Sequence, residues 1–261
     1  MAAVSRYTAP MSRTHKLTLL GLGALAAVSL LANGWLLRLA RRYYIHAQEA
    51  QLDPLGLRAA GISLTPGTAL PEGVTRVVFF GDSRARQWPA PEGPAGFEFI
   101  PRGLDGQTSA QVLERYAYHV APLAPDIVVI QAGVNDFRLL ALYPDRQAAL
   151  TAECVENLRA LVDLAAADGA TVILTTVFPT GPAPLPERLF WLPPMREVIA
   201  AVNADLAGWA GPNVLVLDTA AILAEGGEVR ADYAFDALHL SEAGYAALNT
   251  VLVEVLRGLD K

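Results

Sequence analysis

The 261-residue sequence predicts an α/β fold with a doubly wound, mainly parallel sheet, preceded by one transmembrane helix. Four short apolar runs rich in β-branched residues recur along the chain, as expected for strands buried on both faces of a parallel sheet. Helical patterns alternate with these runs, which is typical of a doubly wound fold. An uncharged apolar stretch near the N-terminus is long enough to cross a bilayer.

The apolar runs define the expected strands, which are residues 77–80, 126–131, 171–176 and 214–217, with 97–100 as a weaker candidate. The helical patterns define the expected helices, which are residues 109–120, 146–167, 195–209 and 241–256. Right-handed crossovers place the loops after parallel strands along one edge of the sheet, and ligands bind at that edge. The polar residues that directly follow each strand are therefore the candidates for function.

Residues 17–37 form the expected membrane anchor. The stretch carries no charge, and Asn33 is its only strongly polar residue. As a helix it spans about 31 Å, close to the thickness of the hydrocarbon core. A cleaved signal peptide is the alternative, but the apolar run is long and no clean small-x-small cleavage site precedes a polar start of a mature chain. We therefore expect an uncleaved single-pass anchor.

The anchor divides the chain into four expected parts. Residues 1–16 are an N-terminal tail, 38–74 are a stalk and linker, and 75–261 are the folded domain. The stalk is expected to be helical up to a turn at Asp53-Pro54, whereas residues 61–73 are rich in Gly, Pro and Thr, which indicates a linker or a wrapping loop. Basic residues flank both ends of the anchor almost equally, so the positive-inside rule leaves its orientation open.

The bulk composition excludes several classes of protein. The net charge of -6 argues against a nucleic-acid partner, because such proteins usually present a basic face. Cys154 is the single cysteine, so an internal disulfide is impossible. Cysteine and histidine do not occur at the spacing of a zinc site, so we expect no metal. We expect no organic cofactor either.

The loop after the first expected strand reads Gly81-Asp82-Ser83. A serine on a tight turn at the carboxyl end of a strand can present its hydroxyl to a cleft, and a nearby backbone N–H can stabilise an oxyanion. The alternative is an ordinary helix cap, since Asp and Ser are both preferred at that position.

A serine nucleophile needs a base, and His239 is the candidate. The chain has four histidines: His15 adjoins the anchor, His46 lies in the stalk and His119 lies in a helical pattern. Only His239 is in a loop of the folded domain, just before an expected helix. Asp236, three residues earlier, can accept a hydrogen bond from the imidazole and fix its tautomer. The alternative for His239 taken alone is a surface histidine.

Two further loops carry candidate donors to an oxyanion. Residues 102–108 contain two glycines before a Thr cap, which lets the backbone approach a ligand closely. Asn135 follows the strand at residues 126–131, and its side-chain amide can donate to developing negative charge. The alternatives are a plain turn with a cap and an Asn that satisfies loop backbone.

Taken together, these four blocks resemble the SGNH/GDSL hydrolase family over roughly residues 76–256. The resemblance implies a flavodoxin-like, three-layer α/β/α sandwich. It implies Ser83 as the nucleophile, with Asp236 and His239 completing a catalytic triad. It also implies an oxyanion hole made by the Ser83 N–H, the Gly106 N–H and Asn135. Gly106 is preferred to the other loop glycine because it directly precedes Gln-Thr, where the family places its second-block glycine.

The sequence departs from the family pattern after the nucleophile. Arg84 stands where family members often have Leu, and it is a candidate to hold an anionic group of the substrate. A structural ion pair with a surface carboxylate is the alternative. Arg102 stands where the second block often starts with Asn. Trp191, in the long loop at residues 178–194, is a second candidate substrate contact, and a packed lid is its alternative.

The predicted function is therefore that of a membrane-anchored serine esterase with its catalytic domain outside the cytoplasm. The expected partners are the membrane and an ester-bearing small molecule, lipid or acylated glycan. An O-acyltransferase that uses a glycan or cell-envelope hydroxyl in place of water would need the same residues. A non-catalytic tethered binding module on the same fold is the third reading.

Overall fold

The computed structural model describes residues 12–57, 61, 67–93, 95–138, 140–185, 188 and 192–259. The chain divides into two compact units, Met1–Pro54 and Leu55–Lys261, which are taken separately below.

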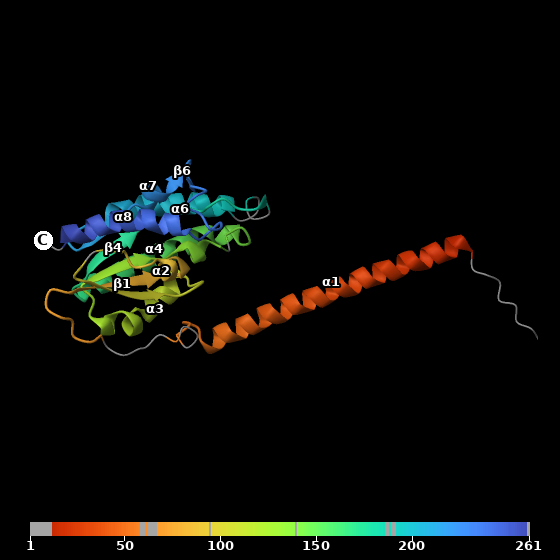
Figure 1. Ribbon diagram of the computed structural model, residues 1–261, viewed down its shortest axis with the longest axis horizontal. Coiled ribbons are helices and arrows are strands. Elements are labelled where there is room, and N and C mark those ends of the chain that lie inside the picture. Colours follow the sequence, from red (N-terminus) through yellow and green to blue (C-terminus); the bar gives the residue numbers. More distant parts are fainter. Residues whose placement is uncertain are drawn as a thin grey trace, which may run out of the picture. The chain divides into compact units, whose positions relative to one another are not determined.

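The described part of the first unit is a single long helix, α1 (Arg13–Leu52), labelled in Figure 1. Ser12 caps its start by accepting the His15 N–H, and Asp53 follows its end. The most apolar 18-residue window of α1 has a mean hydropathy of 1.8, and the helix is long enough to cross a membrane. A signal sequence meets the same criterion. The predicted anchor at residues 17–37 and the helical part of the predicted stalk thus form one continuous helix.

The second unit is built on a five-stranded sheet, in the part of the chain that the structure describes. Its strands are β1 (Thr75–Gly81), β2 (Phe97–Gly103), β3 (Ile127–Gln131), β4 (Thr171–Thr175) and β5 (Val214–Leu217). They pair in the order β2-β1-β3-β4-β5, and every pair is parallel. This is the flavodoxin-like order, in which β2 is added on one side of β1 and β3 to β5 on the other, so the switch point lies between β1 and β3. The predicted doubly wound α/β fold is confirmed.

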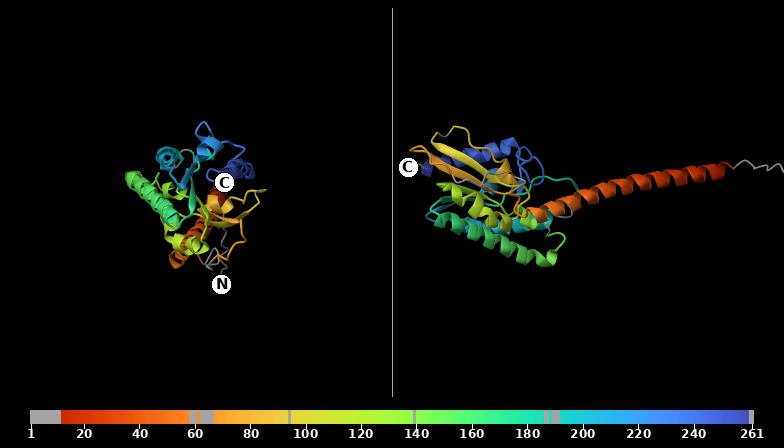
Figure 2. Two further views of the ribbon diagram at one scale, coloured as in Figure 1. Left: turned by 90° about the vertical axis from the view of Figure 1, so that its left-hand side faces the viewer. Right: turned by 90° about the horizontal axis from the view of Figure 1, so that it is seen from below.

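Helices cover both faces of the sheet, which gives three layers (Figure 2). One face packs against α3 (Ser109–His119), α4 (Gln147–Ala167) and α6 (Leu192–Leu206). The other face packs against α8 (Glu242–Leu259) and the short α7 (Thr219–Leu223). A flavodoxin-like α/β/α sandwich is therefore present.

The continuous apolar strands supply both hydrophobic cores. Successive side chains of a strand point to opposite faces, so Val78 and Phe80 of β1 join one core while Val77 and Phe79 join the other. All four side chains are at most 2% exposed. The apolar run in the sequence is unbroken because neither face of β1 meets water.

Gly81 fixes how the chain leaves β1. It pairs with Gly103 of β2 and Gln131 of β3, and a Cβ built on Gly81 would lie 1.6 Å from the Gln131 carbonyl oxygen. Only glycine fits so close an approach, and its φ of 155° also favours glycine. The short helix α2 (Ser83–Gln87) begins directly after this point, with Asp82 capping it through the Arg84 N–H.

Several short elements have no counterpart among the predicted ones. They are α2, α7, the antiparallel pair β6 (Ala224–Glu225) and β7 (Glu228–Val229), and the 3₁₀ turns η1 (Ala121–Leu123), η2 (Val134–Phe137) and η3 (Pro144–Arg146). Segments of two to five residues are too short to show a hydrophobic period. The predicted helix at residues 195–209 is α6 followed by the 3₁₀ turn η4 (Ala207–Trp209).

The segment before β1 packs on the second unit where the structure describes it. The Gly67 N–H donates to the Pro122 carbonyl at 2.9 Å, and Arg76 donates to the Thr68 carbonyl at 2.7 Å. Leu55 accepts a hydrogen bond from Gln107 at 2.7 Å. The second unit thus begins 20 residues before the predicted domain start at Thr75, and these parts wrap the domain.

Candidate active site

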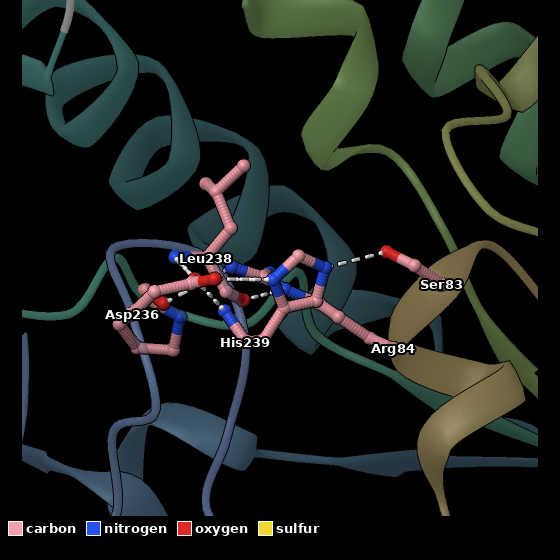
Figure 3. Close-up of polar contacts among 6 residues, drawn as sticks. Ser83, Arg84, Asp236, Leu238 and His239 are labelled. Atoms are coloured by element: carbon pink, nitrogen blue, oxygen red, sulfur yellow. Dashed lines mark hydrogen bonds and ion pairs between the residues drawn. The ribbon is translucent and has the colours of Figure 1, made fainter.

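Ser83, His239 and Asp236 form a continuous hydrogen-bonded chain (Figure 3). Ser83 Oγ lies 3.1 Å from His239 Nε2. On the other side of the ring, His239 Nδ1 lies 3.0 Å and 2.9 Å from the two carboxylate oxygens of Asp236. The imidazole can therefore take the serine proton while the carboxylate holds the opposite N–H.

Different elements bring these three side chains together. Ser83 is the first residue of α2, immediately beyond the carboxyl end of β1. Asp236 and His239 lie in the loop before α8, which is held closed because the Phe235 N–H donates to the His239 carbonyl at 2.9 Å. The contact between Ser83 and His239 therefore joins residues 156 positions apart in the sequence.

The Asp236 carboxylate is fixed by its own loop. Its Oδ1 accepts the N–H groups of Leu238 and His239, each at 2.8 Å. Partial burial alone would raise the pKa of the Asp236 carboxyl, but the imidazole and these two N–H groups bring the pKa below its usual range. The group is therefore anionic at neutral pH and aligned with the His239 ring.

The predicted oxyanion donors lie in the two loops that follow β2 and β3. Gly106 occupies the turn after β2 with a φ of +72°, and Asn135 lies in η2 after β3. Asn135 Nδ2 donates to the Gln107 carbonyl at 3.0 Å, which ties these two loops together. Within the described residues, neither the Ser83 N–H nor the Gly106 N–H has a protein acceptor, so both can donate to a ligand.

Residues 63–247 match the GDSL-like lipase/acylhydrolase family. The chain belongs to this family. The family relationship makes the protein a hydrolase that acts on ester bonds.

Solved structures agree with the fold of this GDSL-like hydrolase. A candidate acylhydrolase from Bacteroides fragilis is 27% identical with a TM-score of 0.59, and the match covers 75% of this chain and 92% of that one. A GDSL-like lipase from Bacteroides thetaiotaomicron is 23% identical with a TM-score of 0.59, covering 80% and 98%. An acetylxylan esterase from Geobacillus stearothermophilus, solved as a catalytic mutant, is 22% identical with a TM-score of 0.50, covering 71% and 95%. No curated protein sequence matches the chain significantly.

The position of Arg84 in this GDSL-like hydrolase differs from both sequence-based interpretations. Its side chain is completely buried, so its guanidinium has no exposed surface to offer an anionic substrate group. It donates to the backbone carbonyls of Leu238, Phe178 and Pro179, and the expected ion pair with a surface carboxylate is not formed among the described residues. The sequence could not show this, because only the tertiary fold brings those carbonyls to it. Trp191 lies outside the described residues.

Arg115 supports the loop that carries Gly106. It is fully buried in α3 and donates to the side chain of Gln107 and to the backbone carbonyls of Gly81 and Arg102. The guanidinium also lies 4.4 Å from the ring centroid of Phe80. Sequence reasoning missed this residue, since an arginine in an amphipathic helix is typical of its solvent face.

The buried carboxyl of Asp82 lies directly before the nucleophile. Burial raises the pKa of the Asp82 carboxyl to about 6, although the charge and N–H of Arg84 oppose this shift. Its Oδ1 accepts the Arg84 N–H at 2.8 Å, and its Oδ2 has no partner within the described part of the chain. Asp82 therefore caps α2 at the cost of an incompletely solvated carboxyl group.

The described residues hold no group of three or more His, Cys, Asp or Glu side chains that could bind a metal ion. The chemistry that the arrangement can perform rests on a hydroxyl, an imidazole, a carboxylate and N–H donors. These are the groups of acyl transfer through a serine.

Proposed function

We propose that this hydrolase cleaves an ester through Ser83 as nucleophile, His239 as base and Asp236 as the group that orients the base. The observation that carries the proposal is the hydrogen-bonded chain from Ser83 Oγ through the His239 ring to the Asp236 carboxylate, with distances of 3.1 Å and 2.9 Å. These distances fall within the reach required of a nucleophile and its base.

In the first step, His239 Nε2 takes the proton of Ser83 as its Oγ attacks the ester carbonyl carbon. The imidazolium that forms is stabilised by the Asp236 carboxylate, and it returns the proton to the leaving alcohol. Water then attacks the acyl-serine, with His239 again acting as base, and the carboxylic acid leaves. The second step regenerates the serine hydroxyl.

We propose the Ser83 N–H, the Gly106 N–H and the Asn135 amide as the oxyanion hole. The two backbone N–H groups lack protein acceptors among the described residues, and Asn135 uses one of its two amide hydrogens on Gln107. Donors already oriented toward the developing charge need no rearrangement during the reaction.

We further propose that α1 is an uncleaved single-pass anchor and that the catalytic unit lies outside the cytoplasm. The support is the length and apolar composition of the helix together with its continuation past the predicted span to Leu52. An envelope location favours ester substrates there, namely lipids and acylated glycans.

A Ser83→Ala variant tests the reaction. We expect the variant to lose hydrolysis of a short-chain p-nitrophenyl ester and to resist labelling by an organophosphonate, whereas the wild type is labelled at Ser83. The matched control is Thr250→Ala, since Thr250 is exposed, its Oγ1 donates to the Ala246 carbonyl within α8, and it lies outside the proposed triad. Full activity of Ser83→Ala would contradict the proposal.

The acceptor requirement separates hydrolysis from transfer. Ester cleavage in buffer without an added glycan supports the esterase, because water is then the acceptor. Acyl transfer to a glycan hydroxyl with no cleavage in its absence would replace the esterase by an acyltransferase. Folded wild-type protein that is neither labelled nor active would leave only a tethered binding module.

A further inference from the structure

Arg84 is rigidly attached to the nucleophile. It follows Ser83 in α2, and its N–H donates to Asp82 Oδ1 at 2.8 Å. Its carbonyl accepts the hydroxyl of Tyr245, from α8, at 2.9 Å. The backbone of Arg84 is therefore held on both sides, so its side chain projects from a fixed base beside Ser83.

The Arg84 guanidinium reaches two loops that lie far apart in the sequence. Its Nε donates to the Leu238 carbonyl at 2.6 Å, in the loop that carries the proposed base (Figure 3). Its Nη1 and Nη2 donate to the carbonyls of Phe178 and Pro179, after β4, at 2.8 Å and 3.4 Å. A planar guanidinium carries five donors on three nitrogens and can satisfy three carbonyls at once, whereas leucine has no donor and lysine carries its three donors on a single nitrogen.

The two loops also contact one another. The Gly181 N–H donates to the Ala237 carbonyl at 2.9 Å, and a Cβ built on Gly181 would lie 2.6 Å from the Asp236 carbonyl oxygen. The loop after β4 therefore contacts the loop of Asp236 directly, and Arg84 donates to carbonyls of both loops. In the loop of the proposed base, the carbonyl that Arg84 binds is that of Leu238, the residue immediately before His239.

We propose that Arg84 is a positioning residue that sets the distance and angle between Ser83 and His239, an inference that rests on the proposed triad. The guanidinium connects the helix of the nucleophile to the loop of the base through one rigid side chain. Complete burial excludes it from contact with substrate in this arrangement. A misplacement of about 1 Å between reacting groups can cost about 10²-fold in rate.

The buried charge of Arg84 is compensated locally. Burial lowers the pKa of its guanidinium to about 10, while the Asp82 carboxylate and the Tyr245 hydroxyl oppose this shift. The side chain is therefore still protonated at neutral pH, and its hydrogens point at carbonyl dipoles. Removing it leaves three carbonyls without their donor and releases the loop of His239.

The test uses Arg84→Met and Arg84→Lys in the full-length protein. For Arg84→Met we expect kcat for a short-chain ester to fall about 10²-fold with KM changed little, because substrate binding does not involve this side chain. The rate of organophosphonate labelling of Ser83 falls in parallel, since the phosphonate also needs the Ser83–His239 contact. Arg84→Lys keeps the charge but spans fewer carbonyls, so its kcat is intermediate.

Arg76→Met is the matched control. Like Arg84, Arg76 is a buried arginine, and it donates to the Leu123 and Thr68 carbonyls. It lies near the start of β1, at the end of the strand away from the site. We expect this variant to lower the melting temperature while kcat per labelled site stays at the wild-type value. A loss of stability alone therefore does not reproduce the Arg84 effect.

The outcomes separate this inference from the proposed function. If Ser83→Ala is inactive while Arg84→Met keeps wild-type kcat, the positioning role is wrong and the proposed triad stands. If Ser83→Ala retains full activity, the triad itself is wrong. If Arg84→Met fails to fold, the kcat of Arg84→Lys tests the positioning role instead. Titration with the organophosphonate then counts the protein molecules whose Ser83 reacts. Wild-type kcat per titrated site in that variant would overturn the inference.

Discussion

Asn135 illustrates how a single amide can serve both structure and chemistry. One hydrogen of its Nδ2 binds the Gln107 carbonyl at 3.0 Å, and the second is available to a substrate oxyanion. We expect Asn135→Ala to lower kcat by about 10²- to 10³-fold, the usual cost of one oxyanion donor, with a smaller change in KM. Steady-state kinetics on a short-chain ester measures this. The control is Asn213→Ala, an exposed residue just before β5, and an equal loss in both variants would contradict the assigned role.

The buried Asp82 carboxyl makes a prediction about stability and pH. Its pKa is raised by burial from 3.8 to about 6, and the charges around it are Arg84, Asp136, His239 and Arg115. Because its pKa is higher in the folded state than in the unfolded state, its contribution to stability is complete below pH 3.8 and is lost as the pH rises through 6. The loss corresponds to about 3 kcal/mol, from a shift of about two pKa units.

Asp82→Asn removes this titration while keeping an oxygen that can accept the Arg84 N–H. The stability of the wild type relative to Asp82→Asn should therefore fall between about pH 4 and pH 7. Thermal unfolding of both proteins across this range measures the difference. A difference that stays constant with pH would show that Asp82 does not titrate as described.

At the scale of elements, the proposed membrane anchoring depends on α1. Two arginines in its apolar centre, as in Leu25→Arg with Leu30→Arg, each cost about 2.5–3.5 kcal/mol on insertion. We expect this double variant to leave the membrane fraction under alkaline carbonate extraction, while the wild type stays in it. Ala47→Arg, in the polar part of the helix, should behave as the wild type. A shortened soluble wild-type product would instead identify residues 17–37 as part of a cleaved signal sequence.

Elements with a strong apolar pattern could be predicted, and short ones could not. The runs at 77–80, 126–131, 171–176 and 214–217 correspond to β1, β3, β4 and β5. The strands β1, β3 and β4 are buried on both faces and need continuous apolar residues, whereas β5 is an edge strand that is apolar but mostly half-buried or exposed. The weaker pattern at 97–100 belongs to β2, an edge strand whose residues are mostly half-buried. The helix α2, which presents Ser83, has five residues and is fixed by contacts rather than by periodicity.

At the scale of the whole molecule, the boundary between α1 and the second unit leads to a prediction about truncated chains. The Leu55 carbonyl accepts a hydrogen bond from Gln107 Nε2, and the Gln107 carbonyl accepts one from Asn135 Nδ2. We expect a chain lacking residues 1–54 to be soluble with kcat within about twofold of the full chain. A chain lacking residues 1–74 also loses the Thr68 acceptor of Arg76, and each buried group left unpaired costs about 1–3 kcal/mol.

The shorter chain should therefore melt at a lower temperature and show reduced kcat. Thermal unfolding and ester hydrolysis on the two purified fragments measure both effects. Identical behaviour of the two fragments would place the start of the functional domain at Thr75, as the sequence alone predicts.

The sequence by itself determined the fold class and the identity of the polar residues at the strand ends. Both follow from local patterns, since strand periodicity and the residues after each strand are contiguous in the chain. The tertiary structure decided what Arg84 and Arg115 do, because their partners include backbone carbonyls that lie distant in the sequence. It also decided the pKa of Asp82, because burial by the fold raises it. A backbone carbonyl is present at every residue, so no sequence pattern marks which three of them a buried guanidinium will bind.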